Sequence, residues 1–320
     1  MRPDTVLVVT ASYDIAAGYV LEVLRERGSP AFRLNTDEFP SKIKASFVPP
    51  SSIRLADGEA ILAAESVKSV WYRRHVMPML PSGVAPGIKD FCEREVDAFL
   101  GGVLATLPTD RWMSSPHAIV RAERKPYQLA VASRLGFEIP HTLITNDPFS
   151  VADLAGHRQL IAKAISSGYV ASPKGNRAIF TSALCPEDLE ELEGLALAPV
   201  LFQELIDKTS DIRVTVVADE VFAAEILSQE SSSSRVDWRA TKNPHLPHRV
   251  HDLPLSISEL CVELVDYLGL VFGAIDLALR ADGTYVFFEI NPNGEWLWLE
   301  DQLGFPISTR IAQWLDAGGD

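Results

Sequence analysis

The sequence contains few cysteines and is short of positive charge. Only three of its 320 residues are cysteines, Cys92, Cys185 and Cys261, and they lack the spacing of metal ligands. Three thiols cannot all pair with one another, so reduced thiols in a cytoplasmic protein are the simplest interpretation. The 43 Asp and Glu residues outnumber the 29 Lys and Arg residues, which gives a formal net charge of −14. This balance argues against a nucleic-acid backbone as the main partner.

Several motifs are also absent. No apolar stretch reaches the roughly 18 residues of a membrane span, and the run at residues 6–9 is too short for a signal-peptide core. The sequence has no Gly-x-x-x-x-Gly-Lys-Ser/Thr loop, no Gly-x-Gly-x-x-Gly fingerprint and no Gly-x-Ser-x-Gly elbow. His245, His248 and His251 recur at every third position, but the intervening prolines favour a loop over a zinc site. No membrane partner is expected.

The features that the sequence does contain predict a mixed α/β protein with more than one lobe. Hydrophobic residues make up 47% and charged residues 22%, as in ordinary globular proteins. A strand at residues 5–10, a helix at 16–27 and a strand at 31–34 predict a parallel α/β sheet. Turn residues near 112–116 predict the end of this first domain, so its expected bounds are 1–115.

Two further domains are expected, at residues 116–206 and 207–320. Hairpins are predicted in the second of these, at residues 211–227 and 273–291, with a helix between them. The hairpin at 273–291 carries the most informative residues of the chain.

An apolar strand in this hairpin ends in Glu289 and Asn291. Strand side chains alternate between faces, so these two oxygen ligands point the same way. The Asp-Gly pair at 282–283 predicts a two-residue turn, which places Asp276 opposite Glu289. Like charges so placed repel, so a positive group is expected between them. A three-residue loop would instead turn Asp276 to the other face.

Two carboxylates and an amide oxygen on one face suit a hard cation. Mg²⁺ typically binds one or two carboxylates together with substrate phosphates, which favours nucleotide chemistry. The alternative is an acidic strand end on a solvated face of the sheet.

Two lysines are candidate phosphate ligands. Lys163 lies in an apolar strand and precedes a Ser/Gly-rich loop, so it either serves a buried anion or faces solvent. Lys125 lies near the start of a helix, where phosphates bind favourably, although most such lysines are solvated.

Arginines form a second set of candidates. Asp211 and Arg213 share one face of a strand, and Asp237 and Arg239 follow a run of serines. Arginine suits bidentate binding of phosphate or carboxylate, while the alternative is salt bridging among neighbours. The pair at 73–74 follows a strand at its carboxyl end, where α/β sheets present ligand-binding groups.

Taken in order, these motifs resemble the ATP-grasp superfamily. The resemblance is carried by Lys125, residues 136–142, Lys163, residues 203–206, residues 211–213, Asp276 and residues 289–291. It is closer to the peptide-macrocyclising ligases of the microviridin, or graspetide, type, through residues 70–74, 236–239 and 291–300. Glu295 is a departure, because glutamine is expected there in many relatives.

The resemblance implies an ATP-grasp fold. A Rossmann-like pre-ATP-grasp domain would precede two lobes that hold ATP between antiparallel sheets. It also implies a role for each matching residue. Glu204 and Ile206 would meet adenine, Asp211 the ribose, Lys125 and Lys163 the phosphates, Asp276, Glu289 and Asn291 the Mg²⁺ ion, Arg213 and Arg239 the reacting groups, and Arg73, Arg74, Asp237, Asn293 and Glu295 the substrate.

The implied activity is the cyclisation of a ribosomally made precursor peptide that has a leader and a core with acidic and Ser, Thr or Lys residues. ATP would convert a side-chain carboxylate to an acyl phosphate, and a hydroxyl or amine would then form an ω-ester or ω-amide. A homodimer is expected from the resemblance. The alternatives are an ATP-grasp ligase that adds free amino acids to a small molecule or protein tail, and a non-catalytic ATP-dependent module that binds peptides.

Overall fold

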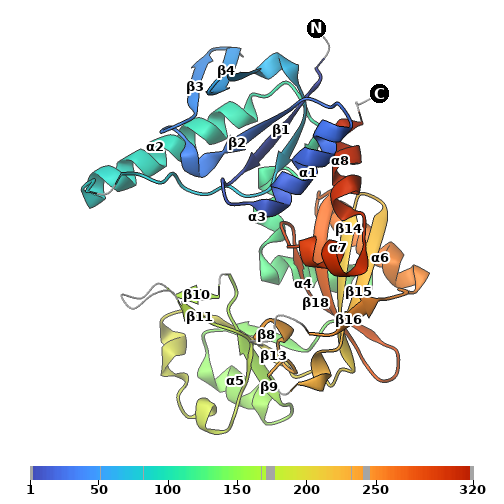
Figure 1. Ribbon diagram of the computed structural model, residues 1–320. Helices are drawn as coiled ribbons and strands as arrows, with labels where there is room; N and C mark the ends of the chain where they lie inside the picture. The colour runs from blue at the N-terminus through green and yellow to red at the C-terminus, as the bar shows by residue number, and fades with distance from the viewer. Residues whose placement is uncertain are drawn as a thin grey trace. The chain divides into compact units, whose positions relative to one another are not determined.

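The computed structural model describes residues 3–50, 52–81, 83–166, 168–170, 177–231, 233–240 and 246–317, which excludes His245. The chain divides into two compact units (Figure 1). Unit 1 comprises residues 1–116 and 295–320, and unit 2 comprises residues 117–294.

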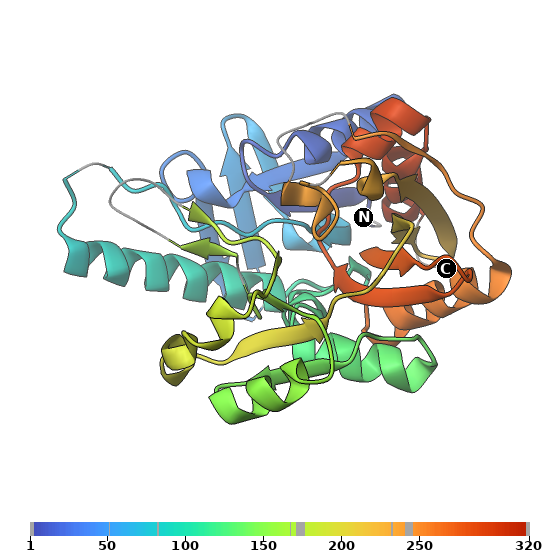
Figure 2. The same ribbon diagram turned by 90° about the horizontal axis from the view of Figure 1, so that it is seen from below.

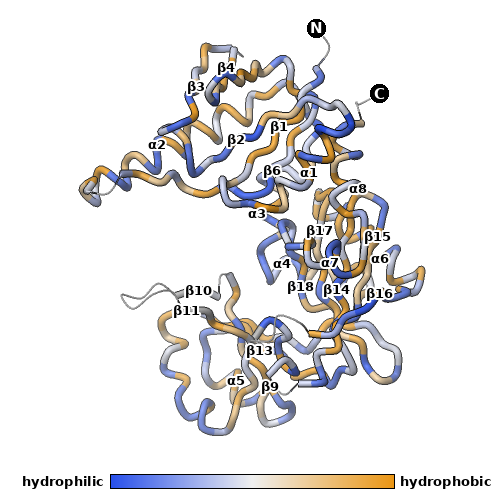
Figure 3. The backbone as a smooth tube through the Cα atoms, viewed as in Figure 1, coloured by the Kyte–Doolittle hydropathy of each residue, from blue (hydrophilic) through white to orange (hydrophobic). Residues whose placement is uncertain are grey.

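Unit 1 is built on a parallel sheet with the strand order β2-β1-β6-β7. Its central strand, β1 (Thr5–Thr10), is apolar along its middle (Figure 3), and the residues at 6–9 are fully buried. A strand covered on both faces needs such a continuous apolar run. The other strands are β2 (Ala31–Asn35), β6 (Val67–Tyr72) and β7 (Trp112–Met113). The predicted parallel α/β sheet is confirmed.

The described residues of this unit form the helices α1 (Ile15–Glu26), α2 (Pro86–Ala105), α7 (Leu297–Leu303) and α8 (Ile307–Asp316). The carboxyl-terminal half of α2 buries Val96, Leu100 and Val103 in the core, whereas its amino-terminal half extends beyond the sheet in both views (Figures 1 and 2). A small antiparallel sheet completes the unit, with β3 (Lys44–Val48), β4 (Ser52–Asp57) and β5 (Ala60–Ala63). No described helix combines the length and the hydropathy that crossing a membrane requires.

Unit 2 contains a four-stranded antiparallel sheet with the order β12-β9-β13-β8. Its strands are β8 (Thr142–Thr145), β9 (Leu160–Lys163), β12 (Ser182–Ala183) and β13 (Val200–Glu204). Helix α5 (Pro148–Ala155) packs on the face that carries Ala162 and Phe202. Since side chains alternate, Lys163 and Gln203 point to the opposite face. A two-stranded hairpin of β10 (Tyr169–Val170) and β11 (Arg177–Ala178) lies nearby in sequence.

The larger sheet of unit 2 is antiparallel, with the order β16-β15-β14-β17-β18. Its strands are β14 (Ser210–Val217), β15 (Glu220–Ile226), β16 (His248–Val250), β17 (Phe272–Leu279) and β18 (Tyr285–Asn291). Helices α4 (Lys125–Leu135) and α6 (Leu255–Tyr267) pack against this sheet, and the short helix α3 (Pro116–Ala122) precedes α4. Both predicted hairpins are present.

The hairpin of β17 and β18 reaches the predicted register by an unexpected route. The Arg280 amide donates to the Thr284 carbonyl at 2.9 Å, so the loop has three residues, 281–283, and the predicted two-residue turn is wrong. Such a loop shifts the register by one, but the register shifts back at a β-bulge, where Phe288 is the extra residue. Asp276 therefore does pair with Glu289.

Phe287 and Phe288 have different surroundings because of this bulge. Phe287 is fully buried, with its ring centroid 5.5 Å from that of Phe137, whereas Phe288 is half-buried and lines a cavity.

We expect Phe287→Ala to lower the free energy of unfolding by about 3–5 kcal/mol, because it empties a closed core. Phe288→Ala is the matched control and should lower it much less, since it removes a ring from a cavity wall. Urea unfolding of both variants checks this. Equal losses would show that the two rings share one environment.

Candidate functional site

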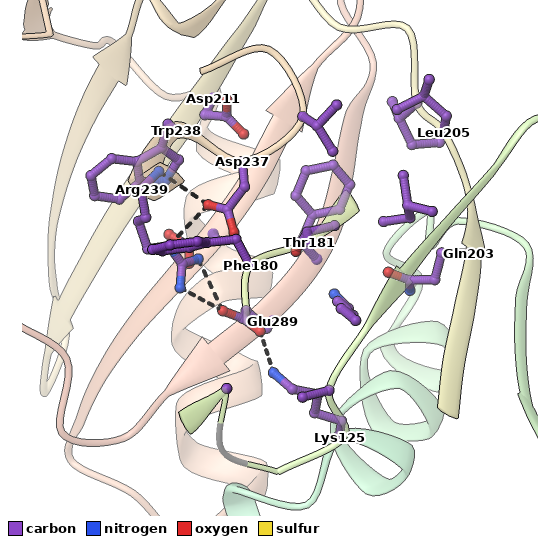
Figure 4. A pocket seen from close by; sticks show the side chains of 18 of the residues that line it. Lys125, Phe180, Thr181, Gln203, Leu205, Asp211, Asp237, Trp238, Arg239 and Glu289 are labelled. Atoms are coloured by element: carbon purple, nitrogen blue, oxygen red, sulfur yellow. Dashed lines mark hydrogen bonds and ion pairs between the residues drawn. The ribbon is translucent and has the colours of Figure 1, made fainter. Parts of the chain in front are cut away.

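A cavity of about 410 Å³ lies in unit 2 between its two larger sheets (Figure 4). The lining includes ten of the residues that the sequence singled out, from both sheets, from α4 and from the loop before β16. These are Lys125, Lys163, Glu204, Ile206, Asp211, Asp237, Arg239, Asp276, Glu289 and Asn291. The antiparallel pairing of β14, β17 and β18 gathers the acids on one face.

The two facing acids are surrounded by cations, as their repulsion requires. Arg213 Nη1 donates to Asp276 Oδ1 at 2.9 Å. Arg239 Nη2 lies 2.6 Å from Asp276 Oδ2 and 3.0 Å from Glu289 Oε1. Lys125 forms an ion pair with Glu289 Oε2. The positive charge expected between the acids is thus provided by three side chains.

These charges set the protonation of the site. Burial by itself would raise the pKa of Glu289, but Lys125, Lys163 and Arg239 outweigh burial and hold that pKa well below its usual range. Burial lowers the pKa of Lys163 to about 8, an effect that Glu289 opposes and that Lys125 and Arg239 reinforce. Asp276 raises the pKa of Arg239, so its guanidinium stays charged. Glu289 therefore remains ionised at neutral pH.

The oxygen donors suit a hard cation that shares its coordination with a ligand. Asn291 Oδ1 accepts a hydrogen bond from the amide of Asn293 at 3.0 Å, which fixes the side chain in the turn after β18. Within the described ranges, no group of three or more His, Cys, Asp and Glu side chains is arranged to hold a metal ion. Two carboxylates and one amide leave positions for phosphate oxygens, as Mg²⁺ sites commonly do.

Strand β13 contributes Gln203, to which the sequence reasoning gave no role. Gln203 is fully buried and points into the cavity (Figure 4), and its Nε2 donates to Thr142 Oγ1 at 2.9 Å. Its Oε1 has no hydrogen-bond partner among the described residues. A buried acceptor without a donor is costly, so this oxygen fits a ligand N–H group. Residues 203–206 were part of the resemblance, but no role was given to Gln203; the pairing of β13 with β9, which puts Gln203 on the face of Lys163, is the signal that could have identified it.

Glu204 is placed differently. Its carboxylate lies 2.6 Å from Arg158 Nη1 and 3.6 Å from Arg280 Nη2. Neither arginine lines the cavity. The acid side chain is thus held by a pair of arginines, while Gln203 extends into the cavity.

A buried ion pair beside the cavity was also missed. Lys208 Nζ lies 2.7 Å from Asp211 Oδ1, and both side chains are buried. The ammonium also lies 5.3 Å from the centroid of the Phe288 ring. Burial raises the pKa of Asp211, and Lys208 opposes that rise. Lys208 precedes β14, so the alternation of that strand gave no signal for it.

Asp237 orients the loop arginine. Its Oδ1 accepts from the Arg239 amide at 3.1 Å and lies 3.6 Å from Arg239 Nε. The short turn that holds both residues includes the 3₁₀ segment η6 (Trp238–Ala240).

Asn293 lies in unit 2, in the turn after β18, whereas Arg73, Arg74 and Glu295 lie together in unit 1. Arg73 is buried at the carboxyl end of β6, where its Nε donates to Asp14 at 2.9 Å. Its guanidinium carbon lies 4.2 Å from the centroid of the Trp296 ring. Arg73 and Arg74 both contact the carboxylate of Glu295. The acid that departs from the expected glutamine thus serves as the counter-ion of this arginine pair.

Comparison with known proteins places these features in context. Residues 5–120 match the MvdD pre-ATP grasp domain, and residues 122–315 match the RimK-like ATP-grasp domain. The macrocyclase MdnC of Microcystis aeruginosa MRC, solved with the precursor peptide MdnA, is 33% identical, with a TM-score of 0.88 over 97% of this chain and 99% of that chain. A RiPP-associated ATP-grasp ligase of Chryseobacterium gregarium, solved with ADP and a leader and core peptide, is 29% identical, with a TM-score of 0.89 over 98% of this chain and 96% of that chain.

Curated relatives are more distant. A probable alpha-L-glutamate ligase of Enterobacter sp. (strain 638) is 27% identical over 208 residues, which cover 62% of this chain and 65% of that ligase. The chain thus spans just under two thirds of the length of the curated relatives it matches.

We expect Lys208→Met to lower the free energy of unfolding by about 3–5 kcal/mol, because it leaves Asp211 buried without its partner. The double variant Lys208→Met/Asp211→Asn should recover most of that loss, since no unpaired charge remains. Urea unfolding of the single and double variants measures the coupling. Additive losses would mean that the ion pair does not act as a unit.

Proposed function

The chain belongs to the RimK-like ATP-grasp family, and from this premise we propose that it is an ATP-dependent ligase that cyclises a ribosomally made precursor peptide. The ATP-grasp resemblance and the mixed α/β fold expected from the sequence are confirmed. The observation that carries the proposal is the pair of opposed carboxylates, Asp276 and Glu289, set among lysines and arginines in a cavity between two antiparallel sheets. Similarity to MdnC over nearly the whole chain supports the peptide substrate.

The cavity residues suit ATP and Mg²⁺. Gln203 Oε1 would accept from the amino group of adenine near Glu204 and Ile206, and Asp211 would accept from the ribose hydroxyls. Lys125 and Lys163 would bind the phosphates, which are the anions that buried lysines need. Asp276, Glu289 and Asn291 would hold Mg²⁺, which neutralises phosphate charge when bound.

The proposed chemistry has two steps. An Asp or Glu side chain of the peptide attacks the terminal phosphorus of ATP, which gives an acyl phosphate and ADP. A Ser or Thr hydroxyl, or a Lys amine, then attacks the acyl carbon and loses its proton, and phosphate leaves. Each cycle forms one ω-ester or ω-amide bond with the net loss of one water from the peptide.

Arg213 and Arg239 are the proposed catalytic residues. Both guanidiniums contact Asp276, and Arg239 also lines the cavity beside the proposed metal ligands. Positive groups there would stabilise the charge that builds on the transferring phosphoryl group and on the tetrahedral intermediate.

Further residues of the enzyme would contact the precursor peptide, and the leader segment of that peptide would bind to the enzyme. Proposed substrate contacts are Arg73, Arg74, Asp237, Asn293 and Glu295. We also propose domains at 1–115, 116–206 and 207–320, a cytoplasmic homodimer, and a core peptide with acidic and Ser, Thr or Lys residues.

A second candidate function is the addition of free amino acids to a small molecule or protein tail. The sequence similarity of this chain to a probable alpha-L-glutamate ligase favours this second function. That reaction would increase the mass of the acceptor by an amino-acid residue, whereas cyclisation decreases it.

We expect a Ser/Thr- and Asp/Glu-rich peptide encoded beside this chain to lose one water per ring when incubated with the protein, ATP and Mg²⁺. Mass spectrometry measures the loss, and Asp276→Asn and Glu289→Gln should abolish both it and ATP turnover. An added amino-acid mass would identify the second candidate function. Turnover retained in both variants would contradict the metal site.

The Lys163 pKa of about 8 predicts a pH dependence. The ammonium is charged below this pH and loses its proton above it, so kcat/KM for ATP should fall as the pH rises through about 8. Lys163→Arg stays charged to much higher pH and should move the fall upward. An unchanged profile in Lys163→Arg would assign the titration to another group.

A further inference from the structure

Arg239 occupies the space between the two proposed metal ligands. Its Nη2 atom lies 2.6 Å from Asp276 Oδ2, and both of its Nη atoms lie within 3.1 Å of Glu289 Oε1. The other oxygen of each acid is already engaged, Asp276 Oδ1 by Arg213 and Glu289 Oε2 by Lys125. Arg239 thus holds the one oxygen of each acid that Arg213 and Lys125 leave, so a metal ion held by these two carboxylates would compete with Arg239.

The two arginines at this site differ in freedom. Arg213 lies on β14 with a side chain that is 7% exposed, and a Cβ atom at Gly294 would lie only 2.5 Å from its Nη2 atom. Arg239 lies in the short η6 turn, and its side chain is 44% exposed. A guanidinium on a turn can rotate away without disturbing the sheet, whereas one packed against backbone cannot. Arg239 is thus the cation that is able to leave.

Electrostatics favour the replacement of Arg239 by a metal ion over the binding of a metal ion beside Arg239. Three cationic side chains already contact two carboxylates, so a divalent ion that entered alone would meet an excess of positive charge. A polyphosphate reverses this balance, because it brings negative charge for the metal and a new bidentate partner for the guanidinium. Metal and nucleotide together can therefore replace Arg239 where metal alone binds poorly.

We propose that Arg239 is a resident counter-cation that exchanges with the metal ion when the nucleotide enters. The inference rests on the proposed nucleotide and metal site and adds a regulation to it. Before nucleotide binds, Arg239 prevents cations from the solvent from binding Asp276 and Glu289. It also offsets the repulsion between these two acids. When nucleotide and metal bind, the guanidinium turns from the carboxylates to the phosphates. Binding of the two ligands is then positively coupled, since each helps to release Arg239.

The test measures Mn²⁺ binding to the full-length protein by electron paramagnetic resonance, with and without ADP. Arg239→Met should tighten Mn²⁺ binding without ADP by about tenfold, because the competitor is gone, and should reduce the gain in affinity that ADP provides. Arg235→Met removes the same charge from the same loop, where the side chain is exposed, and should change neither value. Arg239→Lys keeps the charge but not the planar fork and should fall between wild type and Arg239→Met.

Thermal unfolding without ligands establishes that each variant is folded before Mn²⁺ is added. Unchanged or weaker Mn²⁺ binding in Arg239→Met would overturn the exchange, even if ADP and Mn²⁺ still bind to the wild type. A failure of the wild type to bind Mn²⁺ with ADP would instead overturn the proposed metal site. The two failures are thus distinguishable.

Discussion

The repulsion between Asp276 and Glu289 is the constraint on which the rest of the site depends. The strands β17 and β18 hold two carboxylates opposite each other, and the surrounding cations outweigh burial and hold the pKa of Glu289 well below its usual range. Each cation comes from a different element: Arg213 from β14, Lys125 from α4, and Arg239 from the turn before β16. These three elements therefore meet at the two acids, and the cavity beside them is lined by both acidic and basic side chains.

The two units differ in their sheets and in the side chains that these sheets present. In unit 1 the turn after β1, where a parallel sheet often binds phosphate, is closed by Arg33, whose Nη2 donates to the carbonyls of Ala11 and Asp14. In unit 2 the cavity lies between two antiparallel sheets, each covered by helices on its other face. The proposed nucleotide-binding residues therefore lie in unit 2.

Much of this arrangement was predictable from the sequence, because it depends on short-range periodicity. The apolar run of β1 and the alternation around Glu289 and Asn291 indicated the sheets and the shared face. Features set by packing were not predictable. Adjacent apolar residues at 287–288 conceal a bulge, and the side-chain directions at 203–204 depend on the neighbouring strand. The burial of Arg73 depends on Trp296, a residue more than two hundred positions away.

The bulge at Phe288 also decides which apolar side chains of β18 reach the cavity. In a regular strand, alternation counted back from Glu289 would put Phe287 on the face of the acids and Val286 on the opposite face. The extra residue reverses this order on the turn side of the bulge, so Phe287 is buried against Phe137 while Phe288 lines the cavity. One inserted residue therefore places an aromatic ring in the cavity wall next to the acids and a second ring in the core.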